Sequence, residues 1–436
     1  MNNSPYFNPE RETMTREQIE AYQLERLKET VRHCLTNEFY QKKFKEAGIT
    51  ADDIKTLDDV RKLPFTTKQD LRDTYPFGLS CVPLKDCVRL HSSSGTTGNP
   101  TVILHTQKDL DEWANQVARN LWMVGLRPDD VFQNSSGYGM FTGGLGFQYG
   151  AEKLGMLTVP AAAGNSLRQI KFIKDFGTTA IHAIPSYVTR LYEVMQQEGV
   201  DPRRDTKLKV LVIGAEPHSE EQRKRIEDMM GVKAYNSFGM SEMCGPGVGF
   251  ECKEQNGLHF WEDYYIVEIV NPETLEPVPD GEIGELVLTT LSRETMPLLR
   301  YRTRDLTRVL GRSCPCGRNH VRLDRMRGRS DDMIVLRGVN IFPIQIEKIL
   351  MQFPELGSNY LITLTTDDNN DNMTVEVELN EGTDDYGKLQ ALEKEIKRQL
   401  KDEILLTPIV RLVSKGTLPV SEGKAVRVVD KRKVYQ

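Results

Sequence analysis

The chain has 436 residues and a formal net charge of −6, with 39% hydrophobic and 28% charged residues. A chain of this length exceeds the size at which a single core keeps growing, so we expect two or more domains. It has no long apolar stretch and no long basic run, which argues against a membrane-spanning helix and against nonspecific binding to nucleic acid or anionic membranes.

The first predicted element is a helix near the N-terminus. Thr15 and Gln18 have the spacing of a capping box. Apolar residues then recur at helical spacing, at Leu24, Leu27, Val31 and Leu35. We expect this helix to end near Gly48 and to have a structural role.

Between about residues 88 and 290, short apolar runs alternate with longer helical patterns. Runs 180–184 and 210–213 predict buried strands, and 110–124 and 220–230 predict helices. This alternation is typical of an α/β domain with largely parallel sheets. The second strand leads into a turn formed by Gly214, Ala215 and Glu216. Open α/β sheets tend to bind ligands at such carboxyl ends of strands.

The pattern changes after Gly328. Strand-like runs at 333–336, 360–366, 373–379 and 409–413 are interspersed with a predicted helix over 343–352. Leu389, Leu392, Ile396 and Leu400 mark one face of a further helix. The sequence therefore predicts a large α/β domain over residues 1–328 and a small α+β domain over 329–436.

The most informative motif is the run SSSGTTGNPT over residues 92–101. Its glycines allow backbone N–H groups to approach an anion, and its hydroxyl groups add neutral donors, so the composition suits a polyphosphate. It lacks the Gly-x-x-x-x-Gly-Lys-Ser/Thr pattern of a Walker A loop. A flexible linker is the alternative interpretation.

Further polar clusters punctuate the predicted elements, and each has an ordinary alternative. The segment 238–242 offers an aromatic face and a carboxylate that suits Mg²⁺, or it is an ordinary loop. The segment 301–305 presents Asp305 for a ribose diol, or it is a surface ion-pair cluster. The segment 328–332, interpreted alone, is a polar linker. The segment 421–425, interpreted alone, contains a lysine that is exposed to solvent.

The order and spacing of these segments together resemble the adenylate-forming superfamily and, within it, the phenylacetate–CoA ligases. The resemblance extends from residue 63 to residue 424. Its most specific portions are SSSGTTGNPT (92–101), YGMFTGGLGFQYGAEKLG (138–155), FGMSE (238–242), WEDYY (261–265), YRTRDLTR (301–308) and GRSDDMIVLRGVNIFP (328–343). It implies an enzyme that uses ATP, Mg²⁺ and coenzyme A to convert a carboxylic acid into a thioester through an acyl-adenylate.

The resemblance also implies where the nucleotide binds. The residues that would cover the β- and γ-phosphates are Ser93, Ser94, Gly95, Thr96, Thr97 and Gly98. The residues that would line the rest of the nucleotide site are Gly214, Ala215, Glu216, Phe238, Gly239, Met240, Ser241, Asp305 and Arg329. Among these, Gly214, Ala215, Glu216 and Phe238 would enclose adenine, and Asp305 would hold the ribose hydroxyl groups.

The remaining implied roles concern catalysis. Glu242 would coordinate Mg²⁺, and Lys424 would bridge the carboxylate and the α-phosphate during adenylation. A cation there neutralises charge that otherwise repels an anionic nucleophile. Asp331 would be the hinge about which the small domain rotates to admit coenzyme A.

The predicted acid pocket is aromatic. Tyr138, Phe141 and Phe147 suit a flat apolar ring, so we expect an aryl acid, phenylacetate first. The sequence departs from the family pattern where Asn99 replaces a common lysine, Phe238 a common tyrosine and Phe147 a smaller residue. The last difference leaves another aryl or short acyl acid as an alternative.

A metal site is predicted from four further residues. Cys314 and Cys316 lie in one turn, and Cys252 and His259 form a Cys-x6-His pair about fifty residues upstream. Three thiolates and an imidazole suit tetrahedral zinc, and such a closed set is structural. The Cys-x-Cys spacing is unusual, and four unrelated reduced residues are the alternative. His320 is the reserve ligand, and we expect Cys244 to be a packed thiol.

The expected partners are therefore small molecules. Seven cysteines and a start, MNNSP, without a basic and apolar leader favour a reduced, cytoplasmic protein. The resemblance adds a possible homodimer. The alternatives are an adenylating enzyme with another acid or acceptor, such as a coenzyme-modifying synthetase, and a non-catalytic zinc-binding interaction protein.

Overall fold

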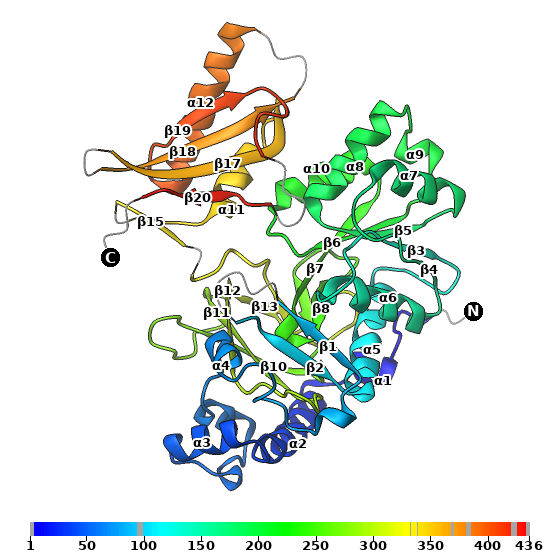
Figure 1. The fold of residues 1–436 in the computed structure, drawn as a ribbon, viewed down its shortest axis with the longest axis vertical. Coiled ribbons are helices and arrows are strands. Elements are labelled where there is room, and N and C mark those ends of the chain that lie inside the picture. The colour runs from blue at the N-terminus through cyan, green and yellow to red at the C-terminus, as the bar shows by residue number, and fades with distance from the viewer. Residues whose placement is uncertain are drawn as a thin grey trace. The chain divides into compact units, whose positions relative to one another are not determined.

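The computed structural model describes residues 4–93, 99–331, 333–337, 339–367, 370–380, 385–419 and 425–432. The chain divides into two compact units (Figure 1). The first consists of Met1–Ala183, Thr206–Ala215 and Tyr235–Met326, and the second of Ile184–Asp205, Glu216–Ala234 and Arg327–Gln436. The expected domain boundary at residue 328 stays a prediction.

The first long helix begins where the sequence predicts. Helix α2 (Arg16–Cys34) has a complete capping box, because the Gln18 N–H donates to Thr15 Oγ1 at 3.3 Å and the Thr15 N–H donates to Gln18 Oε1 at 2.9 Å. Its buried face includes Leu27 and Val31.

The expectation that this helix continues to residue 48 is wrong. The chain leaves the helix after Cys34, and Asn37 accepts a hydrogen bond from the Phe39 N–H at 2.9 Å. That cap starts a second helix, α3 (Glu38–Ala47), which ends at Gly48 in the left-handed conformation.

The other helices of the first unit are α1 (Pro9–Glu12), α4 (Lys68–Asp73), α5 (Gln107–Met123), α6 (Thr142–Leu154) and α7 (Ser166–Asp175), with 3-10 turns η1 (Ala51–Asp53), η2 (Leu57–Lys62), η3 (Leu84–Asp86) and η4 (Ser241–Met243).

The largest sheet has the strand order β13-β14-β9-β8-β7-β6-β5-β3-β4. Its strands are β3 (Val131–Asn134), β4 (Leu157–Val159), β5 (Ala180–Ala183), β6 (Val210–Gly214), β7 (Lys233–Met240), β8 (Gly245–Glu251), β9 (Leu258–Phe260), β13 (Val309–Gly311) and β14 (Arg322–Leu323). The pairs β4–β3, β3–β5 and β5–β6 are parallel, which confirms the predicted α/β pattern, and β5 and β6 are fully buried. The pairs β7–β8, β8–β9, β9–β14 and β14–β13 are antiparallel.

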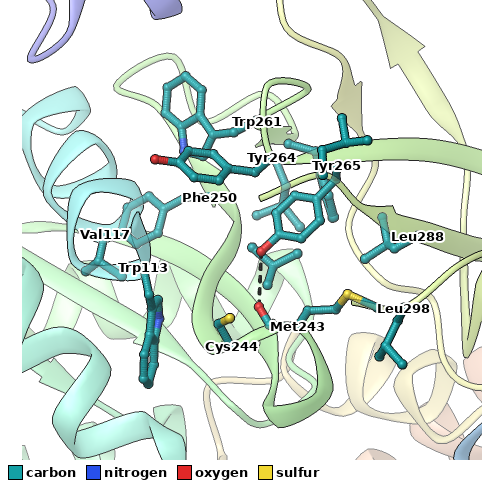
Figure 2. Packing of buried hydrophobic residues seen from close by; sticks show 14 of the residues in the cluster. Trp113, Val117, Met243, Cys244, Phe250, Trp261, Tyr264, Tyr265, Leu288 and Leu298 are labelled. Atoms are coloured by element: carbon teal, nitrogen blue, oxygen red, sulfur yellow. Dashed lines mark hydrogen bonds between the residues drawn. The ribbon is translucent and has the colours of Figure 1, made fainter. Parts of the chain in front are cut away.

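Two smaller sheets complete the first unit. Strands β1 (Arg89–Ser92) and β2 (Val102–His105) pair antiparallel, and β10 (Tyr265–Val270), β11 (Gly284–Thr290) and β12 (Tyr301–Thr307) form an antiparallel sheet. Figure 2 shows part of the core that joins these elements: Trp113 and Val117 from α5, Phe250 from β8 and Tyr265 from β10.

The second unit has its own core. Its helices are α8 (Pro185–Gln197), α9 (Pro202–Asp205), α10 (Glu220–Met230), α11 (Pro343–Leu350) and α12 (Tyr386–Ile404). Its strands are β15 (Ile334–Leu336), β16 (Val339–Ile341), β17 (Leu356–Asp367), β18 (Asn370–Leu379), β19 (Ile409–Val413) and β20 (Val428–Asp430). The order β19-β18-β17-β20 contains a central antiparallel pair flanked by two parallel ones. The α+β pattern is thus confirmed, whereas β20 was not expected from the sequence.

Helix α12 packs by the face that the sequence predicts. Ile396 and Leu400 are fully buried in the same cluster as Val375 and Val377 of β18, and Leu392 packs against it. Within the residues described, no helix is long and apolar enough to cross a membrane.

Candidate active site

The hydroxyl- and glycine-rich run lies between paired strands β1 and β2. At its start, the Ser93 N–H donates to the Thr101 carbonyl at 3.0 Å, and the Thr101 N–H donates to Ser93 Oγ at 2.9 Å. These two hydrogen bonds join the two ends of the run. Its predicted phosphate-binding residues Ser94, Gly95, Thr96, Thr97 and Gly98 lie outside the described residues.

Glu242 lies on the 3-10 turn η4, which directly follows β7. Its side chain is buried, and Lys68 of α4 forms a long ion pair with it, at 3.8 Å between Nζ and Oε1. This long ion pair only weakly neutralises the negative charge of Glu242. Such a carboxylate suits a hard cation such as Mg²⁺, which prefers one or two carboxylates plus phosphate oxygens. Glu242 thus lies at the end of a sheet strand, and its role as a Mg²⁺ ligand stays a prediction.

The turns assigned to adenine are tightly packed. A Cβ atom at Gly214 would lie 2.2 Å from the Ser237 carbonyl oxygen, and one at Gly239 would lie 2.2 Å from that of Gly245. Glycine is therefore required at both positions because backbones approach closely there. Phe238 is half-buried, with its ring centroid 5.9 Å from that of Phe260.

Asp305 lies on β12 and is 9% exposed. The ion pairs of the neighbouring arginines run to Glu285: Arg302 contacts it at 2.7 Å and Arg304 at 3.6 Å. Glu285 is fully buried, so this cluster is not the solvated surface network that the sequence left as an alternative.

Four of the predicted site residues, Glu216, Arg329, Asp331 and Lys424, belong to the second unit. Glu216 accepts hydrogen bonds from the Ser186 N–H at 3.1 Å and from the Ala425 N–H at 2.9 Å. Arg329 forms a bidentate pair with Asp331, with both contacts at 2.8 Å. Lys424 lies outside the described residues.

The residues assigned to the acid differ in exposure. Phe141, the residue that precedes α6, is 55% exposed, and Tyr138 is half-buried. Phe147 is fully buried, and its ring centroid lies 3.8 Å from that of His182 on β5. Phe147 therefore packs against His182 in the core and is not exposed at the surface.

His182 is a residue that the sequence interpretation missed. Asn134 Nδ2 donates to Tyr138 Oη at 3.0 Å and to the Gly144 carbonyl at 2.6 Å, so Asn134 Oδ1 is the acceptor that faces His182 Nδ1 at 3.0 Å. This arrangement identifies Nδ1 as the protonated ring nitrogen. Burial lowers the pKa of His182 to about 3, so the ring is neutral. The signal in the sequence was a lone histidine inside a buried apolar strand.

The predicted metal ligands are brought together. One ligand atom from each of Cys252, His259, Cys314 and Cys316 lies within 4.8 Å of the others. Cys252 Sγ and Cys314 Sγ are 3.7 Å apart, and Cys316 Sγ lies 3.5 Å from His259 Nε2. Zn–S and Zn–N bonds of ordinary length in a tetrahedron give edges of about 3.8 and 3.6 Å, so the donor set fits zinc.

Electrostatics at this cluster also favour a thiolate. A hydrogen bond from the Cys252 thiol and contact with the His259 ring hold the pKa of Cys316 below its usual range. His320 is excluded as the reserve ligand, because Nδ1 accepts from the Glu262 N–H at 3.0 Å and Nε2 donates to the Arg11 carbonyl at 2.9 Å. Burial raises the pKa of Cys244 to about 11, as expected of a packed thiol.

Known proteins match along nearly the whole chain. The family model of AMP-binding enzymes matches residues 20–292, and that of the AMP-binding enzyme C-terminal domain matches residues 338–432. The chain is 44% identical to a phenylacetate-coenzyme A ligase of Thermus thermophilus, over 98% of this chain and 100% of that protein. It is 43% identical to the Escherichia coli protein of the same name, over 97% of each.

The fold is also similar to that of a solved ligase. A crystal structure of 2-hydroxyisobutyryl-CoA ligase, in the postadenylation state in complex with R3-HIB-AMP, superposes with a TM-score of 0.93 at 30% sequence identity. The similarity covers 98% of this chain and 93% of that one.

Proposed function

The chain belongs to the phenylacetate–coenzyme A ligase family of AMP-binding enzymes, and we propose that it joins an aryl carboxylic acid, phenylacetate first, to coenzyme A. The observation that supports this most is the similarity to these ligases over both family segments, from one end of the chain to the other. ATP and coenzyme A are substrates of the reaction.

The proposed reaction has two halves. First, a carboxylate oxygen of the acid attacks the α-phosphorus of ATP, and pyrophosphate leaves with the electron pair of the broken P–O bond. Next, the coenzyme A sulfur attacks the acyl carbonyl carbon and loses its proton, and AMP leaves to give the thioester. Both the nucleophile and the target of the first half are anionic, so that half depends on positive charge at the phosphates.

We assign the following roles to residues of this chain. Glu242 holds Mg²⁺, which neutralises phosphate charge when bound. Asp305 accepts hydrogen bonds from the ribose hydroxyl groups, and Ser93 begins the segment that covers the β- and γ-phosphates. Lys424 bridges the acid and the α-phosphate in the first half, and Asp331 is the hinge that moves it away for the second.

We propose that the acid lies beside the network of His182 and Asn134. Tyr138 and Phe141 supply aromatic surface, and Phe147 fixes the His182 ring from behind. An apolar wall with a neutral imidazole suits a planar, uncharged aryl group. The runner-up functions are ligation of another acid, transfer to another acceptor, and a non-catalytic zinc-binding role.

A panel of aryl and aliphatic acids tests this proposal. We expect AMP release to require the acid, ATP and coenzyme A together, with the highest kcat/KM for phenylacetate. Acid-dependent ATP–pyrophosphate exchange without a coenzyme A thioester would identify another acceptor. No acid-dependent AMP formation under any condition would overturn the enzymatic proposal.

The two halves are separated by Lys424→Ala. We expect this variant to lose ATP–pyrophosphate exchange by about 100-fold or more, because a cation at the developing charge is removed. Transfer to coenzyme A from synthetic acyl-adenylate should persist. Lys431→Ala, at an exposed lysine seven residues further on, is the matched control. Equal losses in both halves would contradict the assigned role.

We further propose that the cluster of Cys252, His259, Cys314 and Cys316 binds a structural zinc ion. The support is the agreement of its distances with a tetrahedral site and the burial of Cys252, His259 and Cys316. A homodimer stays a prediction of the family resemblance, and a cytoplasmic location one of the cysteine content.

A further inference from the structure

We propose that Tyr265 and Arg293 are positioning residues that orient the Glu242 carboxylate by holding the two carbonyl groups of its turn. This inference rests on the proposed function, because the orientation of Glu242 matters when a divalent cation and ATP bind there. Neither residue contacts the reacting atoms in the assignment above.

The turn itself is poorly stabilised by its own backbone. Its internal hydrogen bond runs from the Cys244 N–H to the Ser241 carbonyl, at 3.1 Å. The chain then reverses through Cys244, a non-glycine residue in the left-handed conformation with φ of 74°. A 3-10 turn this short leaves its later carbonyl groups without backbone partners. The carbonyls of Glu242 and Met243 are therefore free to be held by side chains.

Arg293 holds the first of these carbonyls. Its Nη1 donates to the Glu242 carbonyl at 2.7 Å, and its Nη2 donates to the Leu104 carbonyl on β2 at 3.2 Å. The side chain is 6% exposed. A charged, planar guanidinium that is buried and bound to two backbone segments fixes their separation. It thereby ties the Glu242 turn to the strand that follows the predicted phosphate loop.

Tyr265 holds the second carbonyl. Figure 2 shows its ring pointing toward η4, with the hydroxyl group bonded to the Met243 carbonyl at 3.1 Å. The same hydroxyl lies 3.3 Å from Gln116 Oε1, and Gln116 Nε2 is buried without a partner among the described residues. Exchanging the two ends of the Gln116 amide lets its NH2 group donate to the tyrosine oxygen. The tyrosine proton is then wholly available to Met243.

These contacts flank the peptide groups on which the Glu242 side chain sits. Met243 is fully buried beside them, which anchors the turn from the core (Figure 2). The carboxylate itself has weak restraint, since Lys68 is 3.8 Å away. Its direction must therefore be set by the backbone of the turn, and a preorganised ligand binds a cation more tightly than a mobile one.

Tyr264 provides a matched control. It is the preceding residue and is also buried, but its hydroxyl donates to Glu112 Oε2 and accepts from Asn115 Nδ2 on α5, at 2.8 Å each. Tyr264→Phe and Tyr265→Phe thus each remove one buried hydroxyl group from adjacent positions. Tyr265 is the one of the pair whose hydroxyl reaches the Glu242 turn.

The test measures Mn²⁺ binding to the protein by the loss of the free-ion EPR signal in the presence of a non-hydrolysable ATP analogue, after subtraction of the loss that the analogue causes without protein. We expect Tyr265→Phe to weaken Mn²⁺ binding about 5- to 10-fold, the loss that follows from removing one orienting hydrogen bond. Tyr264→Phe should leave it within 2-fold of wild type, although thermal unfolding should report a similar loss of stability for both. In steady-state assays, Tyr265→Phe should raise the Mg²⁺ requirement and leave the KM for the acid unchanged.

A double-mutant cycle makes the test specific to Glu242. In the Glu242→Gln background, the further change Tyr265→Phe should no longer alter Mn²⁺ binding. An unchanged affinity in Tyr265→Phe alone, or equal weakening in both backgrounds, would overturn the positioning role while leaving the proposed function intact. If the wild-type protein binds no Mn²⁺ with the nucleotide and forms no acid-dependent AMP, the positioning role and the proposed function are both overturned.

Discussion

His182 lies in the interior of the α/β sheet, with its ring against Phe147 and its Nδ1 beside Asn134 and Ser136. Its folded pKa of about 3 is below the ordinary value of 6.5, because burial disfavours the charged imidazolium. Between these two values the unfolded chain binds a proton that the folded protein excludes. Stability from this group is therefore complete above pH 6.5 and is lost as the pH falls toward 3.

This histidine gives a pH prediction. At pH 5.5 it should lower the free energy of unfolding by about 1.4 kcal/mol relative to neutral pH. His182→Asn, which cannot charge, should unfold with a shallower dependence on pH between 7 and 5 in urea titrations. Burial raises the pKa of Glu347, which opposes this slope, but Glu347 is present in both proteins and cancels. Identical slopes would show that His182 does not carry the dependence.

The sequence offers Glu242 and Asp305 as candidate site residues, through short motifs and the family resemblance that these motifs carry, but it does not indicate which residues support them. Arg293 bonds to Glu242 across 51 residues and Tyr265 to Met243 across 22, so no local pattern marks either contact. His182 likewise comes beside Asn134 only when β3 and β5 pair.

Helices α5 and α6 pack closely because α6 contains glycines on the face toward α5. A Cβ atom at Gly150 would lie 2.3 Å from Val117 Cγ1, and one at Gly146 would lie 2.3 Å from the Trp113 ring. The Val117 side chain and the Trp113 ring therefore occupy the space that a side chain at Gly150 or Gly146 would need. Gly146 and Gly150 are therefore packing residues in the fold.

Whether a glycine-to-alanine substitution in α6 stabilises or destabilises the protein should depend on the space around the new Cβ atom. Gly150→Ala should destabilise the protein by about 1–3 kcal/mol, since the added methyl group forces the helices apart. Gly143→Ala, where no described residue outside its own helical turn lies within 4 Å of the new Cβ, should be neutral or stabilise it by about 0.5 kcal/mol through lower backbone entropy in the unfolded chain. Thermal unfolding measures both, and equal effects would contradict the close packing.

Elements were predicted best where periodicity and caps agree. The start of α2 was correct because its capping box is local, and β5 and β6 were correct because buried parallel strands are continuous apolar runs. The break after α2 was missed because apolar spacing continues through it while Asn37 starts a new helix. Strand β20 was missed because its three residues are fixed by pairing with β17.

In the first unit as a whole, the proposed zinc cluster lies next to the docking site of the N-terminal segment. Arg318, two residues after Cys316, pairs with buried Glu12 at 2.6 Å and donates to the Pro5 carbonyl at 3.0 Å. Asn319 donates to the Met14 carbonyl at 3.2 Å. A metal that fixes the 314–316 turn therefore also stabilises the binding of residues 5–14.

Metal removal provides the test at this scale. We expect about one zinc per chain in wild type and in Cys244→Ala, whose thiol is buried outside the cluster, and none in Cys316→Ala. Chelation should lower the Tm and expose the segment before α2 to limited proteolysis, because the turn that holds it is released. Stoichiometric zinc in Cys316→Ala would exclude these ligands.

Contacts between the N-terminal segment and residues near 318 cannot form until most of the chain has been synthesised. Glu12 and Arg318 are separated by 306 positions, so at about 5–20 residues per second a ribosome makes the arginine about 15–60 s after the glutamate. Throughout that interval, Glu12 lacks the arginine that pairs with it in the folded protein. We expect pulse-labelled chains shorter than about 320 residues, in which this pair cannot form, to be the ones that a chaperone retains.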